Sequence, residues 1–362
     1  MKVLLLGENR STHIQKWIIG LSGVQSIDLH VVTFKGGPEL AGVKYSYLKK
    51  FLNNKADYLL NLWHFKRLIE QIRPNIVHAH YATSYGFLGA FSNFHPFIVT
   101  GWGADIFDSP ANPVLKYFLR YTFRKADAIT VLSEITRTEM VKLTSKQVEL
   151  IPFGVDIDKF SPRSEMRNSD QGIRIGTIRT LSEKYGVIYL LEAFARLSSD
   201  FSNIHLDIVG DGPLRQELEE RATQLGVSEK VTFYGFINQN TDFQTYIKLL
   251  HRFDIFAILS VLDSETFGVA SVEASACGIP VVASRVGGLP EVVEDNRTGI
   301  IVEPRDIDST ASALRALIEN RELRLKLGEA GVKNVREKYD WKKNVAQMVS
   351  LYYNTIELKR EI

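Results

Sequence analysis

The chain has 362 residues, which is more than one hydrophobic core usually organises, so two domains are expected. Its 45% hydrophobic and 24% charged residues are ordinary for a globular protein, and a net charge of +2 excludes a generally basic nucleic-acid-binding protein. The one cysteine, Cys277, excludes a disulfide framework and fits a reducing compartment.

Positive charge is concentrated in the first part of the chain. Residues 1–160 carry 19 Lys and Arg against 13 Asp and Glu, a balance of +6, which leaves 25 against 29, or −4, for the rest. The first part would therefore favour an anionic partner or a membrane surface. No apolar run reaches the ~18 residues of a membrane span. We therefore expect a cytoplasmic protein, with peripheral contact at the inner face of the cell membrane as one option.

Strands and helices alternate through residues 1–162, the predicted N-terminal domain. Short apolar runs predict strands at 2–7, 29–34, 75–79, 96–100, 127–132 and 148–152, and helical spacing predicts helices that include 12–21, 59–72 and 114–125. Such alternation predicts a parallel sheet with helices on both faces. Ligands bind such sheets beyond the carboxyl ends of the strands, so the loops that follow the strands are where a site is expected.

Two of these loops contain histidines. The loop after the first strand begins with Gly7 and contains His13, and it lacks the three glycines of a dinucleotide-binding fingerprint, which disfavours a dehydrogenase. Residues 74–81 end another strand with His78 and His80. Because side chains alternate along a strand, we place these two histidines on opposite faces. His80, nearer the strand end, is expected to line a cleft, whereas a structural role for His78 is equally open.

Residues 116–125 mix aromatic and basic side chains at helical spacing. Such a helix could rest on an anionic bilayer, or it could pack by its aromatic side chains with its bases in water.

A polar linker is predicted at residues 163–172, and a C-terminal domain at 173–340. Arg179 and Lys184 follow its first strand, on one loop, where an Arg fork and a Lys point charge can grip two phosphate groups. Further strands are expected at 204–209, 231–237 and 298–303, and a last helix at 341–358. Glycines and a proline at 210–213 predict a strand-to-helix turn.

Residues 254–284 read as strand, loop, helix, glycine stop and strand. Glu265 lies in the loop before the helix, where backbone N–H groups and the helix dipole favour an anion. Glu273 follows eight residues later. Two helical turns rise roughly 12 Å, so these carboxylates can hold the two ends of one elongated, hydroxyl-rich ligand.

This stretch, with Phe267-Gly268, the residues 276–282 and Gly287-Gly288 around it, resembles the Glu-x7-Glu signature of retaining nucleotide-sugar glycosyltransferases of family 4. The resemblance is specific from Arg179 to Pro304. It implies the α/β GT-B fold, in which two Rossmann-like, doubly wound parallel-sheet domains face a central cleft. It also implies that the last helix, in 341–362, crosses back onto the N-terminal domain.

The resemblance implies roles for individual residues. Glu265 would meet the donor sugar hydroxyls, and Arg179 and Lys184 would bind the donor diphosphate and neutralise the departing nucleotide. Donor contacts are implied for Gly210, Asp211, Gly212, Gly235, Phe267, Gly268, Val269 and Glu273, the last of these at the ribose. Acceptor-side candidates are Gly7, His13, His80, Trp102 and Asp105. For Asp105, binding an acceptor hydroxyl and capping a helix are both open.

The implied activity is transfer of a hexose-type sugar from a nucleoside-diphosphate sugar to a hydroxyl of a glycan or polyprenyl-linked acceptor, in bacterial surface polysaccharide synthesis. No Asp-x-Asp motif ends a predicted strand at the cleft, so we expect no metal ion, and no cofactor besides the donor itself. We expect no nucleic-acid partner, because no recognised binding motif accompanies the basic residues. Two alternatives stay open. One is a nucleotide-sugar 2-epimerase of the same fold, and the other is a non-catalytic partner subunit of a glycosyltransferase.

Overall fold

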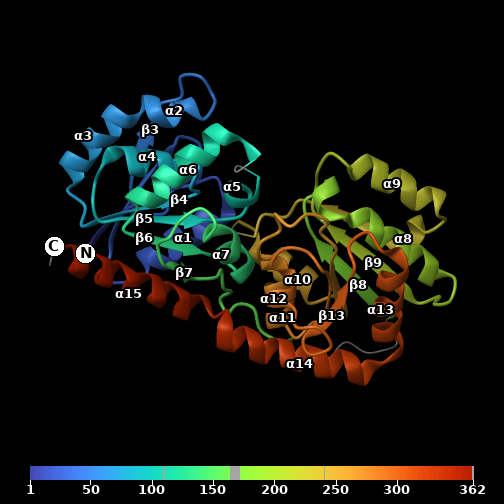
Figure 1. The fold of residues 1–362 in the computed structure, drawn as a ribbon. Helices are drawn as coiled ribbons and strands as arrows, with labels where there is room; N and C mark the ends of the chain where they lie inside the picture. Colours follow the sequence, from blue (N-terminus) through green and yellow to red (C-terminus); the bar gives the residue numbers. More distant parts are fainter. Residues whose placement is uncertain (109–110, 164–171, 240, 361–362) are drawn as a thin grey trace. The chain divides into compact units, whose positions relative to one another are not determined.

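A computed structural model describes residues 1–108, 111–163, 172–239 and 241–360 (Figure 1). The chain divides into two compact units, which are Met1–Pro152 together with Trp341–Ile362, and Phe153–Asp340. Our predicted boundary at residue 162 lies ten residues beyond this division, because residues 153–163 contact the second unit. The Phe153 ring lies 6.2 Å from that of Phe267, and Arg163 bonds the Asp254 carboxylate at 3.2 Å. Most of the predicted linker, 164–171, lies outside the described residues.

The first unit contains a parallel sheet of seven strands in the order β3-β2-β1-β4-β5-β6-β7. Its strands are β1 (Lys2–Leu6), β2 (Asp28–Phe34), β3 (Lys44–Leu48), β4 (Ile76–His80), β5 (Phe97–Gly101), β6 (Ala128–Val131) and β7 (Val148–Leu150). The central strands β1, β4 and β5 are mostly apolar and buried on both faces, as is typical of parallel strands covered by helices. The prediction missed β3, an edge strand whose side chains are mostly half-buried.

Helices cover both faces of this sheet. They are α1 (Thr12–Ser22), α2 (Ala56–Leu60), α3 (Leu62–Ile72), α4 (Tyr85–Ser92), α5 (Ala104–Phe107), α6 (Pro113–Lys125), α7 (Glu134–Met140) and α15 (Trp341–Arg360). Apolar side chains of α3, α4 and α6 form one core with Leu4, Leu6 and Val77. α1 and α15 contact each other and cover the opposite face, onto which His78 points. Among the described residues, no helix combines the length and the apolar character that crossing a bilayer requires.

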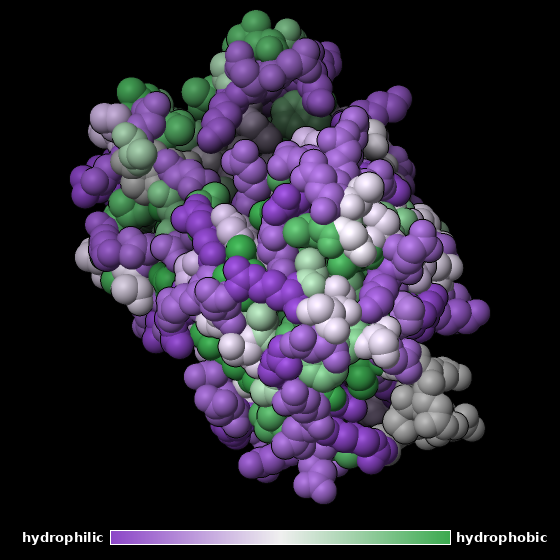
Figure 2. All heavy atoms as spheres, turned by 90° about the vertical axis from the view of Figure 1, so that its right-hand side faces the viewer, coloured by the Kyte–Doolittle hydropathy of each residue, from purple (hydrophilic) through white to green (hydrophobic). Residues whose placement is uncertain are grey.

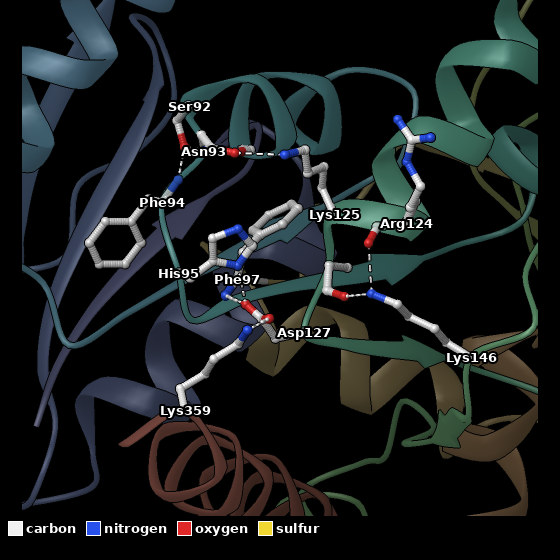
Figure 3. A network of polar contacts seen from close by, with 12 residues as sticks. Ser92, Asn93, Phe94, His95, Phe97, Arg124, Lys125, Asp127, Lys146 and Lys359 are labelled. Carbon is white, nitrogen blue, oxygen red and sulfur yellow. Dashed lines mark hydrogen bonds and ion pairs between the residues drawn. The ribbon is translucent and has the colours of Figure 1, made fainter. Parts of the chain in front are cut away.

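The final helix belongs to the first unit, as predicted, and side chains along its length hold it there. The Trp341 ring lies 4.7 Å from that of Trp17, and the hydroxyl of Tyr352 lies 2.6 Å from Nδ1 of His78. Figure 3 shows the third contact, in which Lys359 Nζ reaches Asp127 at 2.9 Å. Asp127 also accepts hydrogen bonds from His95 Nδ1 and from the backbone N–H of Phe97, so one carboxylate joins the helix to two strands.

His78 and His80 lie on the same face of β4, with ring centroids 4.3 Å apart. The prediction that they point to opposite faces is wrong, because a side-chain period of two returns every second residue to the same face. Both rings are buried beneath α1 and α15. Burial lowers the pKa of His78 to about 3 and that of His80 well below its usual value, so both are neutral at pH 7.

The second unit contains a parallel sheet of six strands in the order β10-β9-β8-β11-β12-β13. Its strands are β8 (Ile173–Ile178), β9 (Ile204–Val209), β10 (Val231–Gly235), β11 (Ile255–Ile258), β12 (Val281–Ser284) and β13 (Gly299–Val302). Its helices are α8 (Val187–Ser198), α9 (Arg215–Gln224), α10 (Phe243–Leu250), α11 (Val269–Ala276), α12 (Leu289–Val292), α13 (Ile307–Glu319) and α14 (Arg321–Lys338). The predicted architecture of two doubly wound parallel sheets is therefore confirmed.

The core of the second unit gathers apolar side chains of α8, α9 and α13 against one face of the sheet, and α11 packs against α14. Hydrophilic side chains cover most of the face that Figure 2 displays, with hydrophobic ones in small separate groups.

The bond between Tyr352 and His78 makes a testable contribution to stability. We expect Tyr352→Phe to lower the free energy of unfolding by about 1–3 kcal/mol, because it leaves a ring nitrogen of a buried histidine without its partner. Urea denaturation measures the change. Tyr353→Phe is the matched control, since Tyr353 is the next residue of α15 and is 41% exposed. Equal effects of the two substitutions would contradict this account.

Candidate active site

The predicted donor residues of the second unit lie in loops at the carboxyl edge of its sheet. Arg179 follows β8, Asp211 follows β9, and Glu265 lies between β11 and α11. Parallel strands end at one edge, so residues that are far apart in sequence meet there.

Glu265 is buried, with 9% of its surface exposed, and both of its carboxylate oxygens accept hydrogen bonds. One oxygen accepts a hydrogen bond of 3.1 Å from the backbone N–H of Gly268, at the start of α11. The other accepts from the hydroxyl of Ser260 at 3.1 Å and pairs with the guanidinium of Arg179. These three contacts fix the carboxylate in orientation.

Arg179 is held through one terminal nitrogen and through one face of its guanidinium. Its Nη2 donates to Glu265 and, at 3.1 Å, to Ser260, and its guanidinium lies 4.2 Å from the ring centre of Tyr185. Its Nε is buried and has no hydrogen-bond partner within the described part of the chain. A buried N–H of a cation without an acceptor is costly, so this atom fits a site that an anion completes.

Lys184 lies beside this pair. Its Nζ donates to the backbone carbonyl of Ser264 at 3.0 Å, one residue before Glu265. Lys184 belongs to the short 3₁₀ turn Glu183–Tyr185, and its own carbonyl accepts from the N–H of Val261 at 2.9 Å. The loops after β8 and β11 are thus tied together, which holds two cations and one carboxylate near one another.

Glu273 is buried in α11 and has two side-chain partners that the sequence did not reveal. Its oxygens accept from Tyr246 at 2.5 Å and from Gln239 at 2.8 Å. Burial, together with the neighbouring carboxylate, raises the pKa of Tyr246 well above its usual value, so the phenol remains a donor. Tyr246 occupies a core position of α10, where no sequence pattern sets it apart from a packing residue.

The predicted glycines allow the loops to approach one another closely. A Cβ on Gly210 would lie 1.8 Å from the carbonyl oxygen of Arg179, and one on Gly212 would lie 2.4 Å from that of Leu181. Gly210 also donates its N–H to the carbonyl of Gly235 at 2.8 Å. Asp211 accepts from the N–H of Gly212 and lies 3.6 Å from Arg215. These contacts position the loop, and donor contact of its residues stays a prediction.

Gly287 and Gly288 pack against the loop that leads into α11. Gly268 has a φ of +71°, and the Phe267 ring before it is buried 5.4 Å from that of Tyr339. The N–H of Gly288 donates to the carbonyl of Glu265 at 2.9 Å, and a Cβ on Gly287 would lie 2.0 Å from that oxygen. The sequence analysis used Gly287 and Gly288 as part of the motif without naming them as site residues.

The acceptor-side candidates lie at the carboxyl edge of the first unit's sheet. Trp102 donates through Nε1 to His80 Nδ1 at 3.2 Å, and the His13 ring lies 5.7 Å from that of Trp102. Neutral His80 therefore carries its proton on Nε2, which is buried without a partner in the described residues. Gly7 directly follows β1, and a Cβ on it would lie 2.7 Å from the side chain of Ile14.

Asp105 is buried, and its carboxylate accepts hydrogen bonds from backbone N–H groups. Its oxygens accept from the N–H groups of Ala82, Trp102 and Gly103 at 2.7, 3.0 and 2.9 Å. Burial raises the pKa of Asp105 above its ordinary value, although these N–H donors act in the opposite direction. The carboxylate fixes the loops after β4 and β5 against each other, and its binding of an acceptor hydroxyl stays a prediction.

Across the described residues, no three His, Cys, Asp or Glu side chains gather as a metal site would require. The predicted independence from a metal is a statement about the reaction, and it stays a prediction.

Two family models match the chain. "Glycosyl transferases group 1" matches residues 160–334, and "Glycosyl transferase 4-like" matches residues 2–133. A phosphatidylinositol monomannoside mannosyltransferase of Mycolicibacterium smegmatis, described as GDP-mannose-dependent, is 32% identical over 66% of this chain and 65% of its own length. The chain thus aligns with less than two thirds of that relative. An uncharacterised glycosyltransferase of Methanocaldococcus jannaschii is 26% identical over 91% of this chain and 90% of its own.

Solved structures share the fold. A sucrose-phosphate synthase of Thermosynechococcus elongatus has a TM-score of 0.84 at 19% identity, covering 98% of both chains. An Anabaena protein solved with UDP has a TM-score of 0.80 at 20% identity, covering 98% of this chain and all of that one. Since the two family models together span nearly the whole chain and the neighbours have its two-sheet architecture, the chain belongs to the group 1 glycosyltransferases of the GT-B fold.

Proposed function

We propose that the protein transfers a hexose-type sugar from a nucleoside-diphosphate sugar to a hydroxyl of a glycan or lipid-linked acceptor, with retention at the anomeric carbon and without a metal ion. One observation carries the proposal. Arg179, paired with Glu265 and flanked by Lys184, has a buried Nε–H for which the described residues offer no acceptor, at the carboxyl edge of a parallel sheet. An anionic diphosphate would supply that acceptor.

The cations address the main difficulty of the reaction. As the bond from the anomeric carbon to the phosphate breaks, negative charge gathers on the departing diphosphate. Arg179 and Lys184, already fixed by Ser260 and by the Ser264 carbonyl, would stabilise this charge with little reorganisation. This is the role that a divalent cation fills in metal-dependent enzymes, which supports independence from a metal.

The carboxylates suit the donor's hydroxyl groups. Glu265 would accept from sugar hydroxyls, and Glu273, held by Tyr246 and Gln239, would accept from the ribose. Both assignments come from the Glu-x7-Glu resemblance. Retention has the same source, as does the role of the leaving phosphate in taking the acceptor's proton.

The relatives and the charge distribution guide the choice of substrates. The mycobacterial relatives are described as GDP-mannose-dependent enzymes acting on a phosphatidylinositol monomannoside, so GDP-mannose is the first donor to test. The excess of cations in residues 1–160 supports a lipid-linked, anionic acceptor and a place at the cytoplasmic membrane face. A role in bacterial surface polysaccharide synthesis follows from such an acceptor.

Donor binding should depend on Arg179. We expect one of a panel of GDP-, UDP- and ADP-sugars to stabilise the protein, by about 2.7 kcal/mol at 100 times its dissociation constant. Thermal shift with and without donor measures this. Arg179→Ala should lose the donor-induced shift, whereas Arg285→Ala, which removes a half-exposed cation paired with Glu303, should keep it. A full shift in Arg179→Ala would overturn the assignment of the diphosphate site.

Tyr246→Phe tests whether Glu273 needs its hydroxyl partner. Hydrogen bonds to charged groups are worth about 1.5–3 kcal/mol, so we expect the donor's dissociation constant to rise about tenfold or more. Isothermal titration measures it. Tyr189→Phe, on α8, is the control and should leave the constant unchanged. If the two variants bind the donor equally well, Tyr246 does not position Glu273 for binding.

The reaction itself distinguishes the three candidate functions. With the stabilising donor and membrane lipid extract, we expect labelled sugar to appear in a lipid or glycan product with the donor's anomeric configuration. EDTA should leave the rate unchanged. A new sugar epimer formed from donor alone would favour the 2-epimerase, and donor binding without any product would favour the partner subunit.

A further inference from the structure

Exposed apolar side chains are concentrated in one short segment of the first unit. Of the fourteen large hydrophobic side chains that the described residues expose, five fall between residues 51 and 63. They are Phe51, Leu52, Leu59, Leu60 and Trp63, and Trp63 is 70% exposed. We call residues 49–67 the docking face. Such a cluster on a water-soluble surface marks an interaction site.

Buried polar groups hold this segment in its shape. The Asp57 carboxylate accepts from the N–H groups of Phe51, Leu52 and Asn53 at 3.1, 2.8 and 2.9 Å. The Asn61 amide bonds both the N–H and the carbonyl of Lys49, at 2.9 and 2.8 Å. The side chains of Phe51 and Leu52 are nevertheless more than half exposed. The loop is thus fixed by its backbone and presents two apolar side chains to solvent.

The charges of the docking face are almost all positive. Its exposed cations are Lys49, Lys50, Lys55, Lys66 and Arg67, and its single carboxylate, Asp57, is buried in the contacts just described. The Arg67 guanidinium lies 5.0 Å from the ring centre of Trp63. Exposed apolar side chains, a Trp and surrounding cations are together typical of a surface that binds the headgroup region of an anionic bilayer.

The docking face adjoins the edge of the sheet where the acceptor-side residues lie. Lys55 Nζ donates to Thr83, in the loop after β4, at 3.3 Å. The Tyr58 ring lies 5.3 Å from that of Phe34, the last residue of β2, and 5.0 Å from that of Tyr85, the first of α4. α2 and α3 lie at the β3 side of the sheet in Figure 1. A membrane at this face would be next to the carboxyl edge.

The other basic and aromatic segment, 116–125, is used differently. On α6, Phe118 packs 5.5 Å from Phe87 of α4, and the Tyr121 ring stacks 4.7 Å from that of Phe91. Its aromatic side chains therefore mainly join two helices, although Val114 and Tyr117 remain exposed. The exposed end of α6 is therefore the alternative site of membrane contact that the experiment must distinguish from the docking face.

We propose that the docking face binds the anionic lipid surface, with Phe51 and Leu52 entering the boundary between headgroups and acyl chains and the cations contacting lipid phosphates. The inference deepens the proposed function, on which its significance rests, since it would deliver a lipid-linked acceptor to the carboxyl edge of this unit. Binding to the bilayer itself requires no sugar transfer, so the two can be tested apart.

The test is cosedimentation of the full chain with vesicles, either of phosphatidylcholine alone or of phosphatidylcholine with phosphatidylglycerol. The chain should bind the anionic vesicles, and less tightly as salt is raised. Phe51→Ser/Leu52→Ser should weaken binding at least tenfold, and Lys66→Ala/Arg67→Ala about fivefold for each cation removed. Val141→Ser/Leu358→Ser, which removes two apolar side chains that are also more than half exposed on other elements, should change nothing.

Three outcomes would overturn the proposal. One is equal binding by Phe51→Ser/Leu52→Ser and the control. Another is loss of binding in Val114→Ser/Tyr117→Ser instead, which would place the contact on α6. The third is no vesicle binding but a dimer by light scattering that Phe51→Ser/Leu52→Ser dissociates, which would make the face a contact between copies. Donor thermal shift without vesicles, unchanged in these variants, separates these failures from failure of the proposed function.

Discussion

The second unit depends on the buried pair of Arg179 and Glu265. Removing two charges from water is expensive, and their attraction offsets this only when other hydrogen bonds satisfy them as well. Ser260 and the N–H of Gly268 supply those bonds, which requires the loops after β8 and β11 to touch. The loop after β9 must then fit against Arg179, and only glycine at residue 210 permits that approach. The shape of the whole edge follows from keeping one ion pair satisfied.

Buried carboxylates do similar work in the first unit. Asp57 gathers the backbone of the docking face, Asp105 joins the loops after β4 and β5, and Asp127 ties two strands to the last helix (Figure 3). A carboxylate accepts several N–H groups at once, so a single buried one can fix a loop that has no regular hydrogen bonding of its own. In both units the strands form a rigid sheet, and buried acidic side chains fix the loops at its edge by accepting hydrogen bonds.

Sequence patterns predicted what depends on local periodicity. The strand Ile204–Val209 falls where its apolar run placed it, and the Glu-x7-Glu spacing located the loop and helix that hold Glu265 and Glu273. The strand Lys44–Leu48 was not predicted, because an edge strand with half-buried side chains lacks a clear apolar pattern. The role of Tyr246 was not predicted for another reason. Its partner lies 27 residues away, and a tyrosine in an apolar helix looks the same whether it packs or holds a carboxylate.

The pairing of Arg179 with Glu265 also explains how the arginine keeps its orientation when no ligand is bound. A guanidinium offers five N–H donors in one plane, and here Nη2 is bonded while Nε has no partner among the described residues. Without Glu265, a desolvated arginine would favour rotating out toward water. With it, the cation keeps its orientation, 4.2 Å from the centre of the Tyr185 ring. The carboxylate therefore keeps the cation oriented without a ligand, and contact of the same carboxylate with the donor's hydroxyl groups stays a prediction.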